Sequence, residues 1–329
     1  MNRGNREFQY VQKKVRITER TKEMSETIIK TRDLTKCFKD CKALNEINLT
    51  VSRGDIYGLI GDNGAGKTTF LKLLAGHLFP TEGEINLFGV HMERELERQR
   101  KRTGVIIEQP GFYPQLSVEQ NLEYYRIQKG IPGKEIVEDI LKIIGLTNMR
   151  KKKGKTLSMG MKQRLGLGIA LLGEPELLIL DEPINGLDPS GIIEMRNLLL
   201  RLNREKNITI IISSHILSEL EQLATVYGFL DRGCLLEQIS AETLHENCKN
   251  YLEMHVSDVE IYTTFLEKEL HHEAYQILPD ETIRIFYPTQ DTEIYSRLAG
   301  AHGVGITRME LREQTLEEHY MKLKGGERS

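Results

Sequence analysis

A glycine-rich segment of eight residues, Gly61–Thr68, constrains the fold of this chain more than any other feature. It reads GDNGAGKT, follows the apolar run Asp55–Ile60, which predicts a strand, and leads into Lys67–Ala75, which predicts a helix. Glycines let successive backbone N–H groups turn inward around a phosphate, and the following helix adds the positive end of its dipole. The pattern GxxxxGK[ST] between a strand and a helix therefore predicts a phosphate-binding loop in an α/β fold.

The loop predicts roles for two of its polar side chains. Lys67 is expected to reach the β- and γ-phosphates of a nucleotide, and the Thr68 hydroxyl is expected to bind Mg²⁺. The alternative is a glycine-rich turn that matches the pattern by chance, but the predicted strand and helix around it argue against that. The predicted nucleotide-binding residues are Gly61, Asp62, Asn63, Gly64, Ala65, Gly66, Lys67, Thr68 and Thr69.

Two adjacent carboxylates follow a second apolar strand. The run Leu177–Leu180 predicts a buried strand, and Asp181 and Glu182 stand at its carboxyl end. In nucleotide hydrolases, one acid at this place holds Mg²⁺ through water and another can orient the attacking water as a general base. Asp181 is predicted to serve the metal and Glu182 the water. Without the phosphate-binding loop elsewhere in the chain, Asp181 and Glu182 could equally belong to an exposed turn.

The remaining pattern predicts strands that alternate with helices over residues 27–240. Several of the strands are apolar throughout, which is typical of a mostly parallel α/β sheet covered on both faces. The further predicted strands are Thr27–Leu34, Ile47–Val51, Val105–Glu108 and Ile208–Ile212, and the further helices are 93–102, 117–146 with a break at Gly130–Gly133, Leu165–Leu172 and Ile192–Asn203.

Both ends of the chain differ from this central part. Residues 1–23 carry seven basic and three acidic side chains without a clear period, so residues 1–26 are predicted to be a basic, disordered extension. A start of the natural chain at Met24 and a membrane-surface role for the extension stay open. Residues 241–329 predict the order β-α-β-β-α-β of a small α+β, ferredoxin-like domain.

Composition excludes several classes of protein. The 329 residues carry 45 basic and 48 acidic side chains, a net charge of -3, which argues against a protein that coats a polyanion. No apolar run approaches the roughly 18 residues of a membrane span, and the N-terminus lacks an apolar signal core. The four cysteines do not form a disulfide framework, and Cys37 and Cys41 lack a second pair of zinc ligands. We therefore expect reduced thiols in a cytoplasmic protein.

A third motif indicates the family. Leu157-Ser158-Met159-Gly160-Met161 resembles the LSGGQ signature of ABC-type ATPases, with Met159 and Met161 in place of the usual Gly and Gln. It lies between the phosphate-binding loop and the Asp181-Glu182 pair. Gly186–Pro189, which contains Asp188, resembles the D-loop, and Ser213-Ser214-His215 resembles the H-loop. These motifs come in the order of the family, and the resemblance covers residues 27–240.

The resemblance implies an ATPase core with a helical subdomain at about residues 110–170. It implies that Phe38 stacks on adenine, that His215 contacts the γ-phosphate or the water, and that Lys67, Glu182 and His215 are catalytic. The glutamine that usually follows the strand before the helical subdomain aligns with Glu108, beside Gln109. Metal contact is therefore expected from Thr68, Asp181 and either Glu108 or Gln109. The implied cofactors are ATP and Mg²⁺.

The resemblance also implies partners. The signature residues Leu157, Ser158, Met159, Gly160 and Met161 would complete the ATP site of a second subunit, most simply a homodimer. Separate transmembrane permease subunits would receive the motion through residues 105–145. The chain would sit peripherally on the inner face of the cell membrane, without a span of its own and without nucleic acid. Within the family, the segment GFYPQLSVEQNL and the extra C-terminal domain resemble ATP-binding subunits of bacitracin- and lantibiotic-type exporters.

Three other interpretations stay open at this point. A soluble ABC-type ATPase of DNA repair would need a long coiled coil between the loop and the signature, and one of translation would need two cassettes. A P-loop kinase or GTPase would leave the signature, Asp188 and His215 unexplained. A catalytically dead subunit would not need Glu182 and His215. Import instead of export also stays open, and the cargo is not encoded in these motifs.

Overall fold

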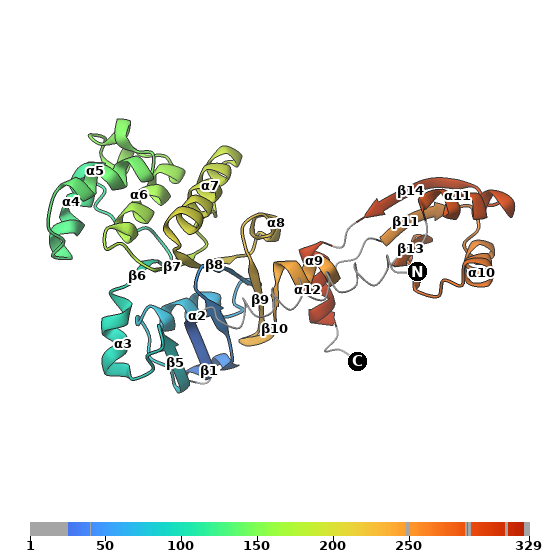
Figure 1. Cartoon of the computed structure of the whole chain (residues 1–329), viewed down its shortest axis with the longest axis horizontal. Helices are drawn as coiled ribbons and strands as arrows, with labels where there is room; N and C mark the ends of the chain where they lie inside the picture. The colour runs from blue at the N-terminus through green and yellow to red at the C-terminus, as the bar shows by residue number, and fades with distance from the viewer. Residues whose placement is uncertain are drawn as a thin grey trace, which may run out of the picture. The chain divides into compact units, whose positions relative to one another are not determined.

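The computed structural model describes residues 26–39, 41–247, 251–286, 288, 291–312 and 315–325. These residues divide into two compact units, with the division between Ile239 and Ser240. Each unit has its own sheets and its own hydrophobic core (Figure 1). Of the extension predicted at residues 1–26, only Glu26 lies within the described residues.

A six-stranded sheet forms the centre of the first unit, with the strand order β10-β9-β4-β8-β7-β6. Strands β4, β8, β7 and β6 pair in parallel, as the apolar runs of the sequence predict. Strand β9, which was not predicted, pairs in parallel with β4. Strands β4, β7 and β8 are buried along their whole length, which requires apolar side chains on both faces. The strands are β4 (Ile56–Ile60), β6 (Thr103–Ile106), β7 (Leu177–Asp181), β8 (Thr209–Ser214), β9 (Val226–Asp231) and β10 (Cys234–Ser240).

A second, antiparallel sheet was not predicted. Strand β1 (Thr27–Phe38) pairs with β2 (Cys41–Ile47), β3 (Thr50–Ser52) and β5 (Glu82–Leu87). The single strand predicted at Ile47–Val51 is wrong, because the chain leaves the ladder at Asn48. The Asn48 side chain accepts a hydrogen bond from the Asp33 amide (2.9 Å) and donates one to the Asp33 carboxylate (3.0 Å). The Asn48 side chain also donates to the Glu46 carbonyl oxygen (3.0 Å), and such a local bond to the backbone favours a turn over a strand.

Helix α2 (Lys67–Leu74) packs between the two sheets. Its buried side chains Phe70, Leu71 and Leu74 belong to one hydrophobic cluster with Ile29 of β1 and Ile179 of β7. The phosphate-binding loop Gly61–Thr68 includes the first two residues of this helix. The loop is therefore held between a strand and a helix that are both anchored in the core.

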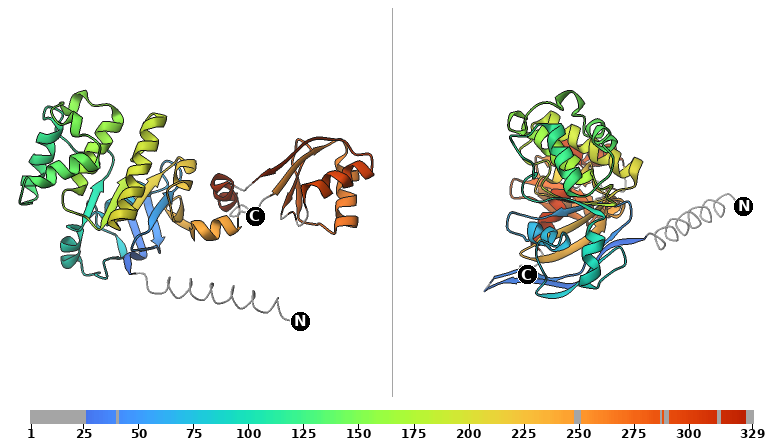
Figure 2. Two further views of the ribbon diagram at one scale, coloured as in Figure 1. Left: turned by 45° about the horizontal axis from the view of Figure 1, so that its top comes forward. Right: turned by 90° about the vertical axis from the view of Figure 1, so that its left-hand side faces the viewer.

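Three of the remaining helices described in the first unit, α4, α5 and α6, form a group beside α7 (Figure 1). Figure 1 shows α4, α5 and α6 together, and both views of Figure 2 place this helical group and the antiparallel sheet at opposite ends of the first unit. Helix α6 is tied to α7 by the ion pair of Arg164 and Glu194 (3.2 Å). The helices are α3 (Glu93–Arg100), α4 (Val118–Gln128), α5 (Glu135–Ile143), α6 (Met159–Leu171), α7 (Pro189–Lys206) and α8 (Leu217–Glu221).

The second unit has the predicted element order β-α-β-β-α-β, flanked by α9 (Ala241–Asn247) and α12 (Leu316–Gly325). Its antiparallel sheet has the order β12-β13-β11-β14. Apolar residues on one face, such as Leu252 and Ile285, form a core with Tyr262 and Tyr295 of the helices. The elements are β11 (Tyr251–Val256), α10 (Val259–Leu270), β12 (Tyr275–Ile277), β13 (Thr282–Phe286), α11 (Thr292–Ala301) and β14 (Ile306–Arg312).

The pairing of β1 with β5 depends on a glycine. Gly83 has a φ of +81°, and a Cβ atom there would lie 2.3 Å from the Asp33 carbonyl oxygen. We expect Gly83→Ala to lower the free energy of unfolding by roughly 1–3 kcal/mol, since both the backbone conformation and the close contact oppose a side chain. Chemical denaturation would measure the change. Gly173→Ala is the matched control, because Gly173 has ordinary φ and open space around it. Equal unfolding midpoints for the two variants would contradict the requirement for a glycine at position 83.

Candidate functional site

The phosphate-binding loop adopts a conformation that only glycine allows at key positions. Gly64 and Gly66 have φ values of +87° and +110°. A Cβ atom on Gly66 would lie 2.8 Å from the Ala43 carbonyl oxygen. The first turn of α2 contains no acidic residue, so the positive end of its dipole is left for an anion.

Lys67 is folded back onto this loop. Its ammonium group donates hydrogen bonds to the carbonyl oxygens of Gly61 (2.6 Å) and Asp62 (3.1 Å), and its side chain is almost completely buried. The loop therefore holds a positive charge at its centre, where the phosphates of a nucleotide are expected.

A chain of hydrogen bonds joins the loop to two neighbouring strands. The Thr68 hydroxyl donates to the Asp181 carboxylate at the end of β7 (2.8 Å), and the Ser213 hydroxyl of β8 donates to its other oxygen (2.7 Å). Asp181 is buried at 7% exposure, yet both carboxylate oxygens are satisfied. Because the carboxyl ends of parallel strands lie at one edge of the sheet, residues distant in sequence meet here.

Glu182 lies at the centre of the predicted catalytic residues. Its carboxylate lies 2.8 Å from His215 Nδ1 and 3.6 Å from the Lys67 ammonium, so the three residues predicted to be catalytic lie together. The Asn185 side chain donates a further hydrogen bond to it (3.1 Å). No role for Asn185 was predicted from the sequence, although it lies three residues beyond Glu182 in the same turn.

The backbone of Glu182 is in the left-handed region, with a φ of +46°. Such a conformation costs a non-glycine residue roughly 1–3 kcal/mol and is held only by its surroundings. Here the Glu182 amide donates to the Ser213 hydroxyl (3.0 Å) and to the Ser213 carbonyl oxygen (3.2 Å). Ser213 thus positions both acids, a role that the sequence analysis did not assign to it.

Glu108 and Gln109 do not join this cluster. Strand β6 ends at Ile106, two residues before the predicted end, and Glu108 has a φ of +66°. Its exposed carboxylate pairs with Lys72 (2.5 Å), and this hydrogen bond lowers the pKa of Glu108. Among the described residues, no hydrogen bond joins Glu108 or Gln109 to Thr68 or Asp181.

The signature residues form the start of α6. The Ser158 side chain caps the helix by accepting a hydrogen bond from the Met161 amide (3.3 Å). Leu157 is buried, whereas Met159 is 51% exposed. Gly160 lies next to Leu187 of the D-loop segment. Within the described chain, no hydrogen bond joins the signature to the phosphate-binding loop.

Two other predicted residues lie at the edges of the site. Asp188 precedes α7, where its carboxylate accepts a hydrogen bond from the Ser190 hydroxyl (3.3 Å). Phe38 is the last residue of β1 and is 44% exposed, and the Lys36 ammonium lies 5.1 Å from the centre of its ring. The ring is therefore accessible to a planar ligand.

A divalent cation would have oxygen ligands in this site. In the described part of the chain, no cluster of three or more His, Cys, Asp or Glu could hold a metal ion by itself. The Thr68 hydroxyl and the Asp181 carboxylate, which already touch, fit Mg²⁺, which binds few protein oxygens and completes its shell with water and phosphate.

Comparisons with known proteins decide the family. The family model described as ABC transporter matches residues 44–185. The bacitracin transport ATP-binding protein BcrA of Enterococcus faecalis is 43% identical over 301 residues, which is 92% of this chain and 97% of that protein. The chain belongs to the ABC transporter family. It is an ATP-binding subunit of this family, and its enzymatic activity is the hydrolysis of ATP.

Two further ABC transporter proteins are similar to about two thirds of the chain. The lantibiotic transport ATP-binding protein SrtF of Streptococcus pyogenes is 40% identical, covering 68% of this chain and 97% of that protein. A solved dimeric structure of MJ0796, a bacterial ABC transporter cassette, is 25% identical with a TM-score of 0.59, covering 65% of this chain and 99% of that cassette. No helix among the described residues of the ABC subunit is long and apolar enough to cross a membrane.

The geometry predicts a specific phenotype for Glu182→Gln. The amide keeps the shape of the side chain but cannot act as a base, so we expect turnover to fall about 100-fold or more while ATP binding persists. Steady-state ATPase assays and titration with a fluorescent ATP analogue would measure the two properties. Glu205→Gln, a change at an exposed position of α7, is the control with ordinary turnover. Near-normal turnover of Glu182→Gln would remove Glu182 from the catalytic role.

Proposed function

We infer that this ABC subunit hydrolyses ATP with the residues that meet at the carboxyl edge of its parallel sheet. The observation that carries this proposal is the contact of Glu182 with both Lys67 and His215. The backbone amides of Gly61–Thr68 and the Lys67 ammonium would bind the β- and γ-phosphates. Lys67 would leave the carbonyl oxygens of its own loop when phosphate oxygens replace them. The Phe38 ring would stack on the adenine.

Thr68 and Asp181 would hold Mg²⁺, which when bound neutralises charge on the phosphates. Glu182 would turn from Lys67 to the attacking water once the phosphates take the ammonium group. His215 would then hydrogen-bond either the γ-phosphate or this water, with Glu182 fixing the orientation of its ring. Asn185 and Ser213 would keep the carboxylate in place, so that little reorganisation is needed at the moment of reaction.

The site of one subunit is incomplete without a second copy. The start of α6 offers its positive dipole end and the Ser158 hydroxyl, yet within the described chain no hydrogen bond joins them to the phosphate-binding loop of the same subunit. In a head-to-tail homodimer, Leu157–Met161 and Asp188 of one subunit would lie against the ATP of the other. The similar cassette MJ0796 forms a dimer, which supports this arrangement. Hydrolysis would remove the bridging phosphate and let the dimer open.

The transported molecule is proposed from the similarity to the bacitracin transport protein. That similarity extends over 92% of the chain and so includes most of the second unit, whereas the similarity to the lantibiotic transport protein covers 68%. We take bacitracin-type peptide antibiotics as the cargo and export through separate permease subunits as the direction. The subunit would act on the inner face of the cell membrane, and residues 105–145 would contact the permease.

Mixing two inactive variants tests the shared site. Lys67→Ala removes the phosphate ligand of one half of the site, and Ser158→Arg blocks the other half while its own loop can still bind ATP. In a mixed dimer, one of the two sites combines both defects and the other combines neither. We expect ATPase activity to return on mixing. If the two sites act independently, each mixed dimer should reach about half of the wild-type activity. Background activity in a mixture with demonstrated heterodimers would contradict completion of the site by a partner.

Bacitracin sensitivity tests the cargo. Cells that lack this subunit should become more sensitive to bacitracin, and the wild-type chain should restore resistance while Glu182→Gln should not, because transport needs turnover. Growth inhibition across a dilution series of bacitracin would measure this, with an unrelated antibiotic as the control. Unchanged sensitivity in the deleted strain would exclude bacitracin as the cargo and leave the ATPase mechanism untouched.

A further inference from the structure

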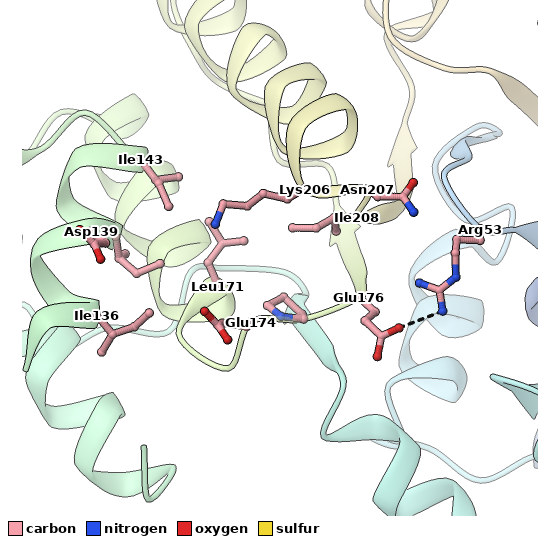
Figure 3. A pocket seen from close by; sticks show the side chains of 12 residues that line it. Arg53, Ile136, Asp139, Ile143, Leu171, Glu174, Glu176, Lys206, Asn207 and Ile208 are labelled. Atoms are coloured by element: carbon pink, nitrogen blue, oxygen red, sulfur yellow. Dashed lines mark hydrogen bonds and ion pairs between the residues drawn. The ribbon is translucent and has the colours of Figure 1, made fainter. Parts of the chain in front are cut away.

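A cavity of about 400 Å³ opens in the first unit at the edge of the sheet opposite to the ATP site. Its walls come from α5, the end of α6, the end of α7 and the residues before β7 and β8 (Figure 3). The volume lies in the range of small-molecule sites. None of its lining residues has a part in the catalytic cluster.

The cavity has an aliphatic floor and a charged rim. Ile140, Leu171 and Ile208 are buried in the floor, and Ile136 and Ile143 of α5 are half-buried at its side. Lys206 extends from the last turn of α7 over this floor (Figure 3). Branched aliphatic side chains around a few charged groups are typical of a ligand site.

The charges on the rim are of two kinds. Arg53 pairs with Glu176 (2.9 Å), and Asp139 pairs with Lys142 (3.4 Å), so these charges are satisfied within the chain. Within the described residues, the Lys206 ammonium and the Glu174 carboxylate form no ion pair. Glu174 has a φ of +48°, and its amide is held by the Leu171 carbonyl oxygen (3.0 Å). One cation and one anion are therefore left for a ligand.

Four of the elements around the cavity lead at their other ends to the signature, to Asp188 or to the ATP site. Helix α6 runs from the signature to Leu171, and α7 runs from Asp188 to Lys206, a length of about 27 Å for 18 residues. Strands β7 and β8 begin beside the cavity and lead to Asp181 and Ser214. Helices α5 and α6 belong to the helical group, whereas α7, β7 and β8 do not (Figure 1). A ligand here would thus bridge this group to the ends of the elements that build the ATP site.

We propose that this cavity binds a small zwitterion with an aliphatic body, of the size of an apolar dipeptide, and that binding slows ATP hydrolysis. Lys206 takes the carboxylate of the ligand, Glu174 takes its ammonium group, and the isoleucines around Ile140 take its side chains. The ligand contacts α5 and α7 together and so stabilises the one relative position of these helices in which it can reach both. Turnover falls because this position is favoured over the others. The effect on turnover rests on the proposed function, whereas binding itself does not.

Calorimetry with Leu-Leu on the purified full-length chain, without nucleotide, tests binding. We expect Lys206→Glu to weaken the affinity about tenfold or more, since it replaces a charge-assisted contact with repulsion. Arg204→Glu makes the same charge change in the same turn of α7 outside the cavity and should bind normally. Absence of binding at millimolar Leu-Leu, or equal loss in both variants, would overturn the proposal.

Two further comparisons define the ligand chemistry and the coupling. N-acetyl-Leu-Leu lacks the ammonium group, so the wild type should bind it more weakly than it binds Leu-Leu. Glu174→Gln and the wild type should bind N-acetyl-Leu-Leu with equal affinity. Ile143→Trp should fill the cavity and abolish binding of Leu-Leu. Saturating Leu-Leu should at least halve ATPase turnover of the wild type and leave Ile143→Trp unaffected. Bound Leu-Leu with unchanged turnover of an active ATPase would overturn the coupling to hydrolysis.

Discussion

The hydrogen bonds at Asp181 are the interaction on which the rest of the site depends. Thr68 comes from the loop before α2, and Ser213 comes from β8, and both donate to this one buried carboxylate. Both carboxylate oxygens are thereby hydrogen-bonded, and the loop is fixed against two strands. An apolar residue at this place would leave the sheet intact but would leave the loop without its link to the catalytic strand.

Glu182 shows how the fold holds a strained residue in place. A left-handed backbone turns the residue after β7 away from the strand direction, so that its side chain faces Lys67 and His215 and not the core. The Ser213 hydroxyl donates to Asp181 and accepts from the Glu182 amide at the same time. One serine therefore couples the position of the proposed metal ligand to that of the proposed base.

The sequence predicted the strands that are apolar throughout and the motifs that follow them, because burial on both faces leaves an unmistakable pattern. It did not predict the antiparallel sheet. Polar and apolar residues alternate along β1 only in part. Its partner β5 contains Gly83, and the need for a glycine there comes from the close backbone of Asp33 on the paired strand. The role of Ser213 was also missed, because its contact with Glu182 joins residues 31 positions apart in the sequence. The role of Asn185 was missed although its contact with Glu182 is local.

The signature helix gives a last argument about where its partner lies. A Cβ atom on Gly160 would approach Leu187 no closer than 3.9 Å, which is ordinary contact, and its φ is not in the left-handed region. The packing of this chain therefore does not require a glycine there, in contrast to Gly66. Met159, beside it, is exposed, so this surface is not filled by its own subunit. Because Gly160 has no side chain, another group can approach the first N–H groups of α6 closely. An anion held by another subunit is a group that such a helix start would accept.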